Sequence, residues 1–484
     1  MVWDYQIPTI VMLTRCFEDG KEKCMQYWPD QTNTSVTRGK FDITVTSLVP
    51  SAEYQIRKMQ LKSKSDPEHE RTVTHMLYTA WPDHGVPRNA MSLISFIHRV
   101  RREHPVSLTT PLLVHCSAGV GRTGTFILLD VAMQQMKREG TLSVFQRLKN
   151  MRTQRMKLVQ TQAQYVFIHD SLSELVVCGE TDVAAGNIRI RMMQLQKPVP
   201  GDPSGLIGFQ KQFETLEEVS SQCEASYQEA KAKYNAGKNR FPDKLPNELG
   251  RVRLRFGPKP GSDYINASFI DGYKQRKAYI ATQGPMEGTV ADLWRMIWEH
   301  NCSCIVMLCQ TQEKGQVSSH CFWPEGEKEE AVYGKLRVGV KRVSHHGDII
   351  ERKLEVEDTE GRGGVQKTVS LMQLSSWPPG ELPHPTAILS LVDLLTKAQR
   401  GSPGRHTVIM CSDGVGRTGT FICIHSQLER LKTEGVVDFF QAAKSARIQR
   451  AALVPDAAHY AFCHDVVATY MDSFETYANF KEVV

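Results

Sequence analysis

Residues 115–127 read HCSAGVGRTGTFI, and residues 410–422 repeat this stretch as MCSDGVGRTGTFI. The cysteines of the two copies, Cys116 and Cys411, lie 295 residues apart. The same offset relates other matching positions: IVML at 10–13 and 305–308, Trp28 and Trp323, Arg155 and Arg450, and Tyr165 and Tyr460. The pair Trp81 and Trp377 departs from it by one residue. A repeat this long indicates two duplicated domains, because solenoid arrays repeat every 20 to 50 residues or so.

The residues around each copy predict a strand, a loop and a helix in that order. A short apolar run, PLLVHC or HTVIMC, precedes each repeated stretch. The residues that follow, FILLDVAMQQMKREG and FICIHSQLERLKTEG, have the apolar periodicity of a helix. Other runs, such as FDITVTSL and YGKLRVGVKRV, alternate apolar and polar residues as strands do. The predicted class is therefore α/β with a mixed sheet.

The first copy has the residues of a phosphate-binding nucleophile site. Arg122 follows Cys116 by six residues, with Gly119 and Gly121 between them. Such a loop can turn successive backbone N–H groups inward at the positive end of a helix dipole, which makes an anion cradle. The arginine can clamp two phosphate oxygens, and the same field favours the thiolate form of the cysteine. This pattern indicates nucleophilic attack at phosphorus.

Two other readings of this loop are less favoured. A free cysteine is more commonly a small buried residue, but the Gly-x-Gly-Arg-Thr context is far more specific than a lone cysteine. A Walker A loop would need Gly-Lys-Ser/Thr, whereas Gly121 is followed by Arg122. Nucleotide binding is therefore disfavoured.

Composition narrows the function classes further. The 484 residues carry a formal net charge of +6, with basic residues scattered along the chain, so no nucleic-acid or membrane-surface partner is implied. Twelve cysteines are too dilute for a disulfide scaffold and have no zinc-site spacing, which favours a reduced, intracellular protein. We expect no metal and no other cofactor, because thiolate and arginine supply what a metallophosphatase takes from ions. From the sequence as given, we expect no signal peptide and no membrane span.

The stretch HCSAGVGRTG, with TAWPDHGVP upstream and QTQAQY downstream, resembles the classical protein tyrosine phosphatases. The tandem arrangement is similar to the intracellular part of receptor-type members, and the end, YMDSFETYANFK, is similar to the alpha and epsilon types. The resemblance implies two domains, each a twisted mixed β-sheet flanked by helices with a strand–phosphate loop–helix active site. The predicted layout is a first domain at 1–178, a linker with a helical middle at 179–206, a second domain at 207–475 and a tail at 476–484.

The resemblance also implies a role for each matching residue of the first domain. Cys116 would be the nucleophile and Asp83 the general acid and base. The remaining expected site residues are Arg122 as the phosphate and transition-state ligand, Thr123 and His115 beside the nucleophile, Ser117, Ala118, Gly119, Val120 and Gly121 as the substrate-binding loop, Gln160 and Gln164 for the attacking water, and Glu18 and Lys23 in a supporting loop.

A second Trp-Pro-Asp, at residues 28–30, is a decoy for the general acid. Its counterpart in the other domain is Trp323-Pro324-Glu325, directly after the supporting loop, and in the family this position is structural. Asp30 is therefore expected to be a solvated turn residue, and Asp83 remains the predicted acid.

The second domain keeps the nucleophile and the clamp, as Cys411 and Arg417, but loses their partners. Its counterparts of the first-domain site residues are Pro379 for Asp83, Asp413 for Ala118, Pro455 for Gln160, His459 for Gln164, Met410 for His115 and Ser318 for Lys23. Loss of the acid alone typically costs about 10²–10⁴-fold, and like charge from Asp413 would oppose phosphate binding and thiolate formation. The second domain is predicted to be a regulatory pseudophosphatase, with Cys411 at most a redox-sensitive thiol.

The second domain also has a segment, 209–296, that the first domain lacks. It contains KNRF at 238–241, where Phe241 replaces the tyrosine with which the family grips phosphotyrosine, and DYINASFIDGY and TQGP. Packing is the favoured role of KNRF, and stacking of the Phe241 ring on a substrate ring is the alternative. Since Met1 corresponds to Met296, about the first third of the first domain is expected to be missing through truncation.

Two functions follow as hypotheses. The favoured one is hydrolysis of phosphotyrosine in tyrosine-phosphorylated proteins by the first domain, with contacts within or between molecules through the second domain. The alternative is a non-catalytic scaffold or binding protein, because the substrate-recognition segment is missing from the first domain. The expected location is cytoplasmic as given, and in full-length form the cytoplasmic side of a single-pass plasma-membrane receptor.

Overall fold

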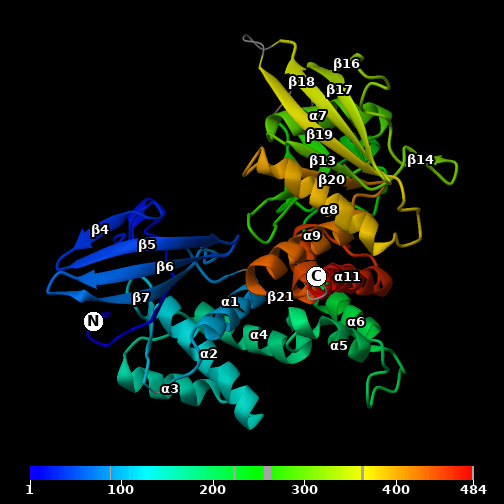
Figure 1. The fold of residues 1–484 in the computed structure, drawn as a ribbon. Helices are drawn as coiled ribbons and strands as arrows, with labels where there is room; N and C mark the ends of the chain where they lie inside the picture. The colour runs from blue at the N-terminus through cyan, green and yellow to red at the C-terminus, as the bar shows by residue number, and fades with distance from the viewer. Residues whose placement is uncertain (88, 108, 222–224, 256–262, 361–364, 482–484) are drawn as a thin grey trace. The chain divides into compact units, whose positions relative to one another are not determined.

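The computed structural model describes residues 1–87, 89–107, 109–221, 225–255, 263–360 and 365–481. The chain divides into two compact units, Met1–Glu180 and Thr181–Val484. Each unit contains one large mixed sheet and a set of helices (Figure 1). The predicted α/β class with duplicated domains is confirmed.

The first unit begins with a run of strands and ends with a run of helices, and a helix and a strand lie between the two runs. They are β1 (Thr9–Met12), β2 (Phe17–Glu18), β3 (Lys21–Glu22), β4 (Ser35–Arg38), β5 (Phe41–Pro50), β6 (Tyr54–Ser63), β7 (Asp66–Tyr78), α1 (Ala90–Glu103), β8 (Leu112–His115), α2 (Gly121–Glu139), α3 (Val144–Gln154) and α4 (Gln162–Cys178).

The first sheet has the order β4-β5-β6-β7-β1-β8, so β8 lies at its edge. β1 pairs in parallel with both β7 and β8, and the other neighbours are antiparallel. The main core of this unit joins strand residues to the inner faces of α1, α2 and α4, around Trp81, Phe96 and Phe126. This packing fixes the end of β8 and the start of α2, where the candidate site lies.

The second unit repeats this series and adds elements before it. Its helices are η1 (Ala185–Asn187), α5 (Ile188–Leu195), α6 (Gly208–Ser221), η2 (Lys233–Lys238), η3 (Glu287–Thr289), α7 (Val290–Glu299), α8 (Pro385–Arg400), α9 (Gly416–Glu434), α10 (Phe439–Gln449) and α11 (Ala457–Lys481). Its strands are β9 (Val183–Ala184), β10 (Arg251–Arg253), β11 (Tyr264–Ile270), β12 (Tyr279–Gln283), β13 (Cys304–Met307), β14 (Gln312–Glu313), β15 (Gln316–Val317), β16 (Glu330–Tyr333), β17 (Leu336–His346), β18 (Ile349–Asp358), β19 (Gln366–Leu374), β20 (Thr407–Cys411) and β21 (Val436–Val437).

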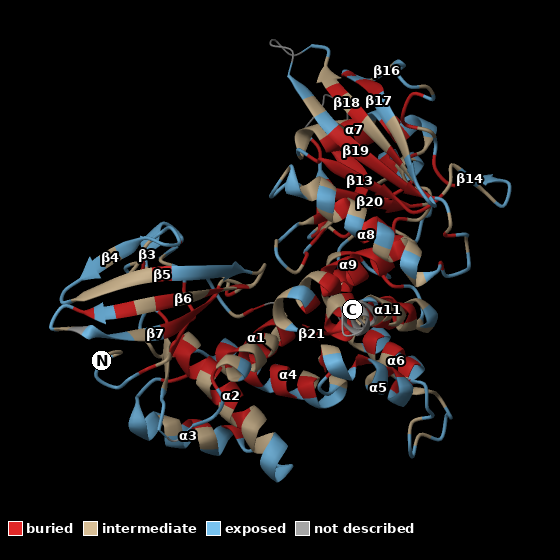
Figure 2. Cartoon of the chain, in the orientation of Figure 1, coloured by how far each residue is buried: buried red, intermediate tan, exposed pale blue. Residues whose placement is uncertain are grey.

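The second sheet contains the whole first arrangement and extends it. Its order is β10-β11-β12-β20-β13-β19-β18-β17-β16, in which β20 corresponds to β8. β12 pairs in parallel with β20, so β20 is an interior strand and is buried throughout. In Figure 2, β13, β19 and β20 are buried along most of their length, whereas β5 of the first sheet is exposed over its second half. In the described part of the first unit, β8 has no partner equivalent to β12.

Several sequence expectations are refined by these elements. The run YGKLRVGVKRV is confirmed as a strand from Leu336 onward, in β17. Its first residue, Tyr333, ends β16, and Gly334 adopts a φ of +65° in the turn between the two strands. The expected tail at 476–484 starts inside α11, which runs to Lys481, and residues 482–484 lie outside the described residues.

The segment 179–206, expected to join the domains, contains the helix α5. From Thr181 onward it is packed on the second unit: β9 pairs with β21, and the Thr181 hydroxyl donates to Asp438 Oδ1 at 2.9 Å. This hydrogen bond is buried. Most of the predicted linker is therefore part of the second compact unit.

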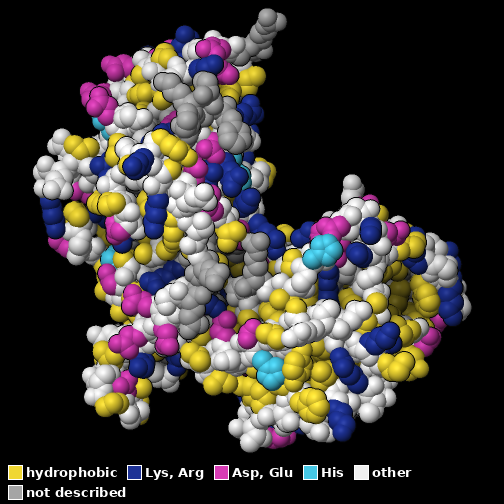
Figure 3. Space-filling view, turned by 180° about the vertical axis from the view of Figure 1, so that it is seen from behind, with side chains coloured by type: hydrophobic (Ala, Val, Ile, Leu, Met, Phe, Trp, Pro, Cys, Tyr) yellow, Lys and Arg dark blue, Asp and Glu magenta, His cyan; other side chains and the backbone are white. Residues whose placement is uncertain are grey.

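The surface carries both signs of charge, and on the face seen in Figure 3 basic and acidic side chains are interspersed. Across the described ranges, no helix combines the length and the apolar character that crossing a membrane requires.

Candidate active site

The loop between β8 and α2 places the Cys116 thiol beside the start of a helix. Gly119 has a φ of +68°, in the left-handed region that favours glycine. Cys116 is 9% exposed, and the Thr123 hydroxyl donates a hydrogen bond to its Sγ at 3.1 Å. Since α2 begins at Gly121, this sulfur lies at the positive end of the helix dipole. The predicted strand–loop–helix order is confirmed.

Arg122 is held by a two-point ion pair on the first turn of α2. Its Nη1 and Nη2 donate to Glu18 Oε1 and Oε2 at 2.6 and 2.8 Å. Further hydrogen bonds from Arg122 reach the carbonyls of Leu13 at 3.1 Å and Pro82 at 3.2 Å. Because two parallel hydrogen bonds fix a guanidinium in plane, the clamp is preorganised. The expected support of Arg122 by Glu18 is present in the geometry.

Glu18 itself is almost fully buried at the end of β2. Burial opposes its charged form, but hydrogen bonds from Arg122, from the Arg15 backbone N–H and from the Thr14 hydroxyl outweigh this, so the pKa of Glu18 is lowered. The carboxylate is therefore charged at neutral pH, as an anchor for the clamp must be.

The Trp-Pro-Asp loop lies against the same arginine. The Trp81 indole N–H donates to the Gly85 carbonyl at 3.1 Å and so closes the loop on itself. The Arg122 guanidinium lies 5.6 Å from the Trp81 ring and also donates to the Asp83 carbonyl at 3.4 Å. The Asp83 carboxylate accepts from the Asp19 backbone N–H at 3.3 Å. Asp83, the predicted acid, therefore contacts both Arg122 and the hairpin formed by β2 and β3, which is the predicted supporting loop.

Gln160 and Gln164 lie beside the loop from the other side. A capping box at the start of α4 holds Gln164, because its backbone N–H donates to Thr161 Oγ1 and its side chain accepts in return. Gln164 Oε1 also accepts from the Gln160 backbone N–H at 2.9 Å. A Cβ atom at Gly121 would lie 3.0 Å from Gln164 Nε2 and 3.3 Å from Gln160 Oε1. Both amides therefore border the phosphate loop.

Gly124, the last glycine of the repeated stretch, permits this contact between α2 and the segment before α4. A Cβ atom at Gly124 would lie only 2.4 Å from the Val159 backbone nitrogen. That nitrogen donates to the Val120 carbonyl at 3.2 Å, which ties the glutamine segment to the phosphate loop. Only glycine fits this close backbone approach.

A layer of rings lies behind Cys116 and involves two residues that the sequence did not indicate. The Tyr27 hydroxyl is 3.0 Å from His115 Nε2, and His115 Nδ1 is 3.3 Å from the Cys116 carbonyl. His75 is fully buried, with its ring 5.5 Å from that of Tyr27 and 4.6 Å from that of Trp28. Burial lowers the pKa of His115, and it lowers the pKa of His75 well below 6.5. Both imidazoles are therefore neutral at pH 7.

The second domain replaces this polar layer with apolar side chains. The counterparts of Tyr27 and His115 are Phe322 and Met410 by the constant offset. His75 pairs with Ile10 in the first sheet as Leu371 pairs with Ile305 in the second, so Leu371 is its counterpart. These joint replacements are a signal in the repeat from which the layer could have been found.

Two residues singled out from the sequence, Lys23 and Asp30, form no side-chain hydrogen bond with Arg122 or Asp83 among the described residues. Among the described residues, the Lys23 side chain forms no hydrogen bond or ion pair with Arg122 or Asp83, although its backbone is part of the supporting hairpin. Asp30 is exposed and accepts from Gln26 at 2.6 Å. This contact fits the expected turn role of Asp30.

The second copy of the loop repeats the skeleton of the first. The Thr418 hydroxyl donates to Cys411 Sγ at 3.1 Å, as in the first domain. Arg417 forms a two-point ion pair with Glu313 at 2.7 and 3.1 Å and donates to the Leu308 carbonyl at 2.7 Å. In the part of the chain that is described, no hydrogen bond joins Arg417 to the loop at Pro379.

Three other substituted residues of the second domain carry neither a carboxyl nor an amide group on their side chains: Pro455, Ser318 and His459. Pro455 Cγ would lie 3.6 Å from a Cβ atom at Gly416, where the first domain has its glutamine amides. The Ser318 hydroxyl donates to Glu313 Oε2 at 3.0 Å, and His459 lies 2.9 Å from Asp456.

Asp413 changes the interior of the second loop. Its Oδ1 accepts from the Cys411 thiol at 3.0 Å and from the backbone N–H groups of Val415 and Gly416 at 2.9 and 3.1 Å. Burial, together with the negative charge and hydrogen bond of Asp413, raises the pKa of Cys411 to about 12. Cys411 is therefore a thiol at neutral pH.

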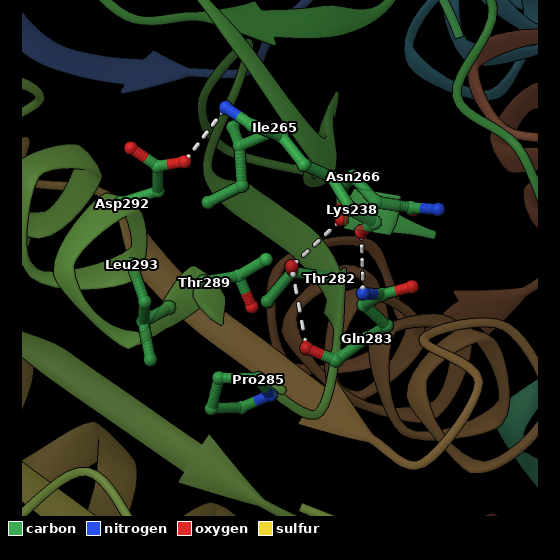
Figure 4. A pocket seen from close by; sticks show the side chains of 9 residues that line it. All are labelled: Lys238, Ile265, Asn266, Thr282, Gln283, Pro285, Thr289, Asp292 and Leu293. Carbon is green, nitrogen blue, oxygen red and sulfur yellow. Dashed lines mark hydrogen bonds and ion pairs between the residues drawn. The ribbon is translucent and has the colours of Figure 1, made fainter. Parts of the chain in front are cut away.

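The KNRF segment of the second domain is engaged in internal contacts. Lys238 Nζ donates to the Tyr264 carbonyl at 3.1 Å and pairs with Asp292 at 2.8 Å, and Arg240 donates to the Gly284 and Pro285 carbonyls. A small pocket beside it is shown in Figure 4. Its lining residues are Lys238, Ile265, Asn266, Thr282, Gln283, Pro285, Thr289, Asp292 and Leu293. Phe241, by contrast, is 37% exposed.

Comparison with known proteins gives the same two-domain division. A family model described as protein-tyrosine phosphatase matches residues 1–174 and 235–469. Receptor-type tyrosine-protein phosphatase F of Rattus norvegicus is 40% identical over 485 residues, which cover 99% of this chain and 25% of that protein. Tyrosine-protein phosphatase Lar of Drosophila melanogaster is 38% identical over 99% of this chain and 23% of its own length.

Receptor-type tyrosine-protein phosphatase alpha of Homo sapiens is 35% identical over 99% of this chain and 59% of that protein. The chain thus spans about a quarter of the length of the F and Lar relatives. Although its last residues resemble the alpha and epsilon types, identity over the whole chain is higher to the F relative than to the alpha relative.

Proposed function

Because this chain belongs to the protein-tyrosine phosphatase family, we propose that its first domain hydrolyses phosphotyrosine through a cysteinyl-phosphate on Cys116. The observation that carries this proposal is the convergence on one loop of a buried thiol, a two-point Arg122–Glu18 clamp, the Asp83 loop and two glutamine amides. Each of these groups matches one step of phosphoryl transfer to and from sulfur.

In the first step, the Cys116 thiolate attacks phosphorus, and the S–P bond forms as the bond to the tyrosine oxygen breaks. The loop N–H groups and Arg122 hold the phosphate oxygens and the charge of the transition state. The Asp83 carboxyl gives its proton to the leaving phenolate oxygen. The Pro82 and Asp83 carbonyls, which accept from Arg122, keep the acid beside the clamp.

In the second step, water attacks the phosphorus of the cysteinyl-phosphate. The Asp83 carboxylate takes a proton from that water, whose oxygen is oriented by the amides of Gln160 and Gln164. The S–P bond breaks, inorganic phosphate leaves, and the Thr123 hydroxyl stabilises the returning thiolate through its 3.1 Å hydrogen bond to Sγ.

The second domain is proposed to be a regulatory pseudophosphatase. It keeps the thiol and the clamp, but Pro379 carries no proton and Pro455 cannot orient water. Because its pKa is raised to about 12, Cys411 is protonated at neutral pH and does not supply a thiolate nucleophile. Its proposed roles are support of the first domain and contacts with partner proteins.

A non-catalytic binding role remains the second candidate, and one comparison favours it. Arg450 is 1% exposed and donates to Asn266 Oδ1 at 2.7 Å, but its counterpart Arg155 is exposed. The elements that cover Arg450 have no equivalent in the described part of the first unit. Arg155 is therefore exposed at the position where β11 of the second unit covers Arg450.

The relatives named above are receptor-type phosphatases. Because these relatives are receptor-type, we propose that the chain is on the cytoplasmic side of a plasma-membrane receptor. Its proposed substrates are tyrosine-phosphorylated proteins. This assignment rests on relatedness alone.

Steady-state hydrolysis of a small aryl phosphate tests the proposal, with Cys116→Ser and Cys411→Ser as matched variants of the full chain. Loss of turnover in Cys116→Ser with full turnover in Cys411→Ser is expected. Turnover that survives Cys116→Ser would overturn the assignment of Cys116 as the nucleophile. An unmodified chain that binds phosphotyrosine peptide without turnover would favour the non-catalytic binding role.

A further inference from the structure

The phosphate loop of the second domain contains a carboxylate oxygen in the place where a phosphate oxygen would bind. Asp413 Oδ1 accepts from two successive loop N–H groups, those of Val415 and Gly416, at 2.9 and 3.1 Å. The Cys411 thiol donates to the same oxygen at 3.0 Å. Inward-facing N–H groups before a helix are the donors with which such loops bind oxyanions. Here the chain supplies the anion itself.

The first domain shows what this loop is like without the carboxylate. Ala118 stands at the position of Asp413 and has no side-chain acceptor. Among the described residues, the backbone N–H groups of Val120 and Gly121 have no hydrogen-bond acceptor. These donors are free for a ligand in the first domain, whereas their counterparts are occupied in the second.

The rest of the second cradle is intact, so one side chain accounts for the difference. Arg417 keeps its two-point pair with Glu313, and Thr418 keeps its hydrogen bond to the thiol. Arg450 Nε donates to the Gly414 carbonyl at 3.0 Å, as Arg155 Nε does to Gly119 at 2.9 Å. The loop is therefore shaped for an oxyanion in a domain that has lost its catalytic acid.

We propose that the second-domain loop is an oxyanion site filled by the chain's own Asp413 carboxylate, and that removal of this side chain opens it to a tetrahedral oxyanion such as phosphate or tungstate. The inference concerns anion binding at Cys411–Arg417 and does not depend on turnover at Cys116.

Occupancy and simple repulsion by Asp413 predict different results. An intramolecular acceptor competes at a high effective concentration, so an incoming anion must break three hydrogen bonds before it can use the same donors. Repulsion alone would disappear with the charge, even if an oxygen stayed in place. Asp413→Asn keeps an oxygen acceptor at nearly the same position without charge, and Asp413→Ala removes both.

Hydrogen–deuterium exchange of the full chain, with and without tungstate, reads the two loops separately because their peptides, 115–127 and 410–422, differ in sequence. In the unmodified chain and in Asp413→Asn, tungstate is expected to leave exchange in 410–422 unchanged. In Asp413→Ala, tungstate at 100 times its Kd is expected to slow it about 100-fold. Asp393→Ala, at an exposed carboxylate on α8, is the matched control and should behave as the unmodified chain.

Slowing of 410–422 by tungstate in the unmodified chain would overturn the proposal, because the site would then be open. Equal slowing in Asp413→Asn and Asp413→Ala would show that charge repulsion by Asp413, and not occupancy of the loop by its oxygen, keeps the anion out. If Asp413→Ala does not fold, Asp413→Asn still decides between the two. The response of 115–127 bears only on the first domain, so failure of the enzyme proposal is read independently.

Discussion

At the scale of single residues, the two halves of the chain share a thiol, an arginine and a threonine, so the proposed difference in activity rests on the groups around them. The Thr–Sγ hydrogen bond is 3.1 Å in both domains, and both arginines hold a buried glutamate. The domains differ in the groups around this skeleton. Asp83, Gln160 and Gln164 are replaced by Pro379, Pro455 and His459, and Ala118 by Asp413.

Asp83→Asn is predicted to lower kcat for phenyl phosphate by about 10²–10⁴-fold, because the phenolate would leave without a proton. The matched control is Asp30→Asn, at the other Trp-Pro-Asp, whose carboxylate meets only Gln26 in the described structure. Steady-state kinetics of both variants check the assignment. An equal loss in the two, or a larger loss in Asp30→Asn, would show that the acid was misassigned.

His75→Leu is predicted to stabilise the first domain by about 1–3 kcal/mol, since both ring nitrogens of His75 are buried without a hydrogen-bond partner. The equivalent strand position in the second sheet already holds Leu371. Leu371→His is the reverse control and should destabilise the second domain. Urea denaturation measures both effects, and a loss of stability in His75→Leu would mean that His75 has a partner such as a buried water.

At the scale of elements, the sequence predicted the strand, loop and helix because Gly-rich loops and apolar periodicity leave clear patterns. It could not give contacts set by the third dimension. That His75 and His115 lie on the two strands that flank β1 depends on β1 pairing with both β7 and β8. The strand β17 was predicted, but the tight turn at Gly334 that separates Tyr333 of β16 from it was missed, because the two lie in one continuous run.

The capping box of α4 is predicted to serve both stability and catalysis. Thr161→Ala should cost about 0.5–2 kcal/mol, because the Thr161 hydroxyl accepts from the Gln164 N–H, and should lower kcat by loosening that glutamine. Ser143→Ala is the control, since Ser143 is the N-cap of α3 without a side-chain capping bond. Thermal unfolding and kinetics of both variants test this. Identical effects would remove the special role of Thr161.

At the scale of the whole molecule, each unit has its own sheet and core, so we expect two unfolding transitions. The constant offset predicted this duplication well. It also located the elements β10 to β12 as an addition in the second unit, which is why β20 is interior and β8 is an edge strand. The packing of residues 181–206 on the second unit was not predictable, because it depends on pairing of β9 with β21 and on the buried Asp438.

The second unit is predicted to lose stability as pH falls from about 6.5 to about 4. Burial lowers the pKa of His425 and of His464 to about 4, so the unfolded chain binds protons in this window and the folded chain does not. The stability from these groups is full above pH 6.5. Thermal melts between pH 7 and 4 measure it, with His425→Gln expected to flatten the slope and exposed His345→Gln to leave it unchanged. A slope that is the same in all three proteins would contradict this origin.

The central claim is that phosphoryl transfer passes through Cys116 and not through Cys411. The most direct test is acid quenching of the full chain during turnover of a phosphotyrosine peptide labelled with ³²P, followed by digestion and identification of the labelled cysteine. The account predicts label on the peptide that contains Cys116, more of it in Gln164→Ala, and none on the peptide that contains Cys411. Label on Cys411, or hydrolysis with no labelled cysteine at any quench time, would contradict it.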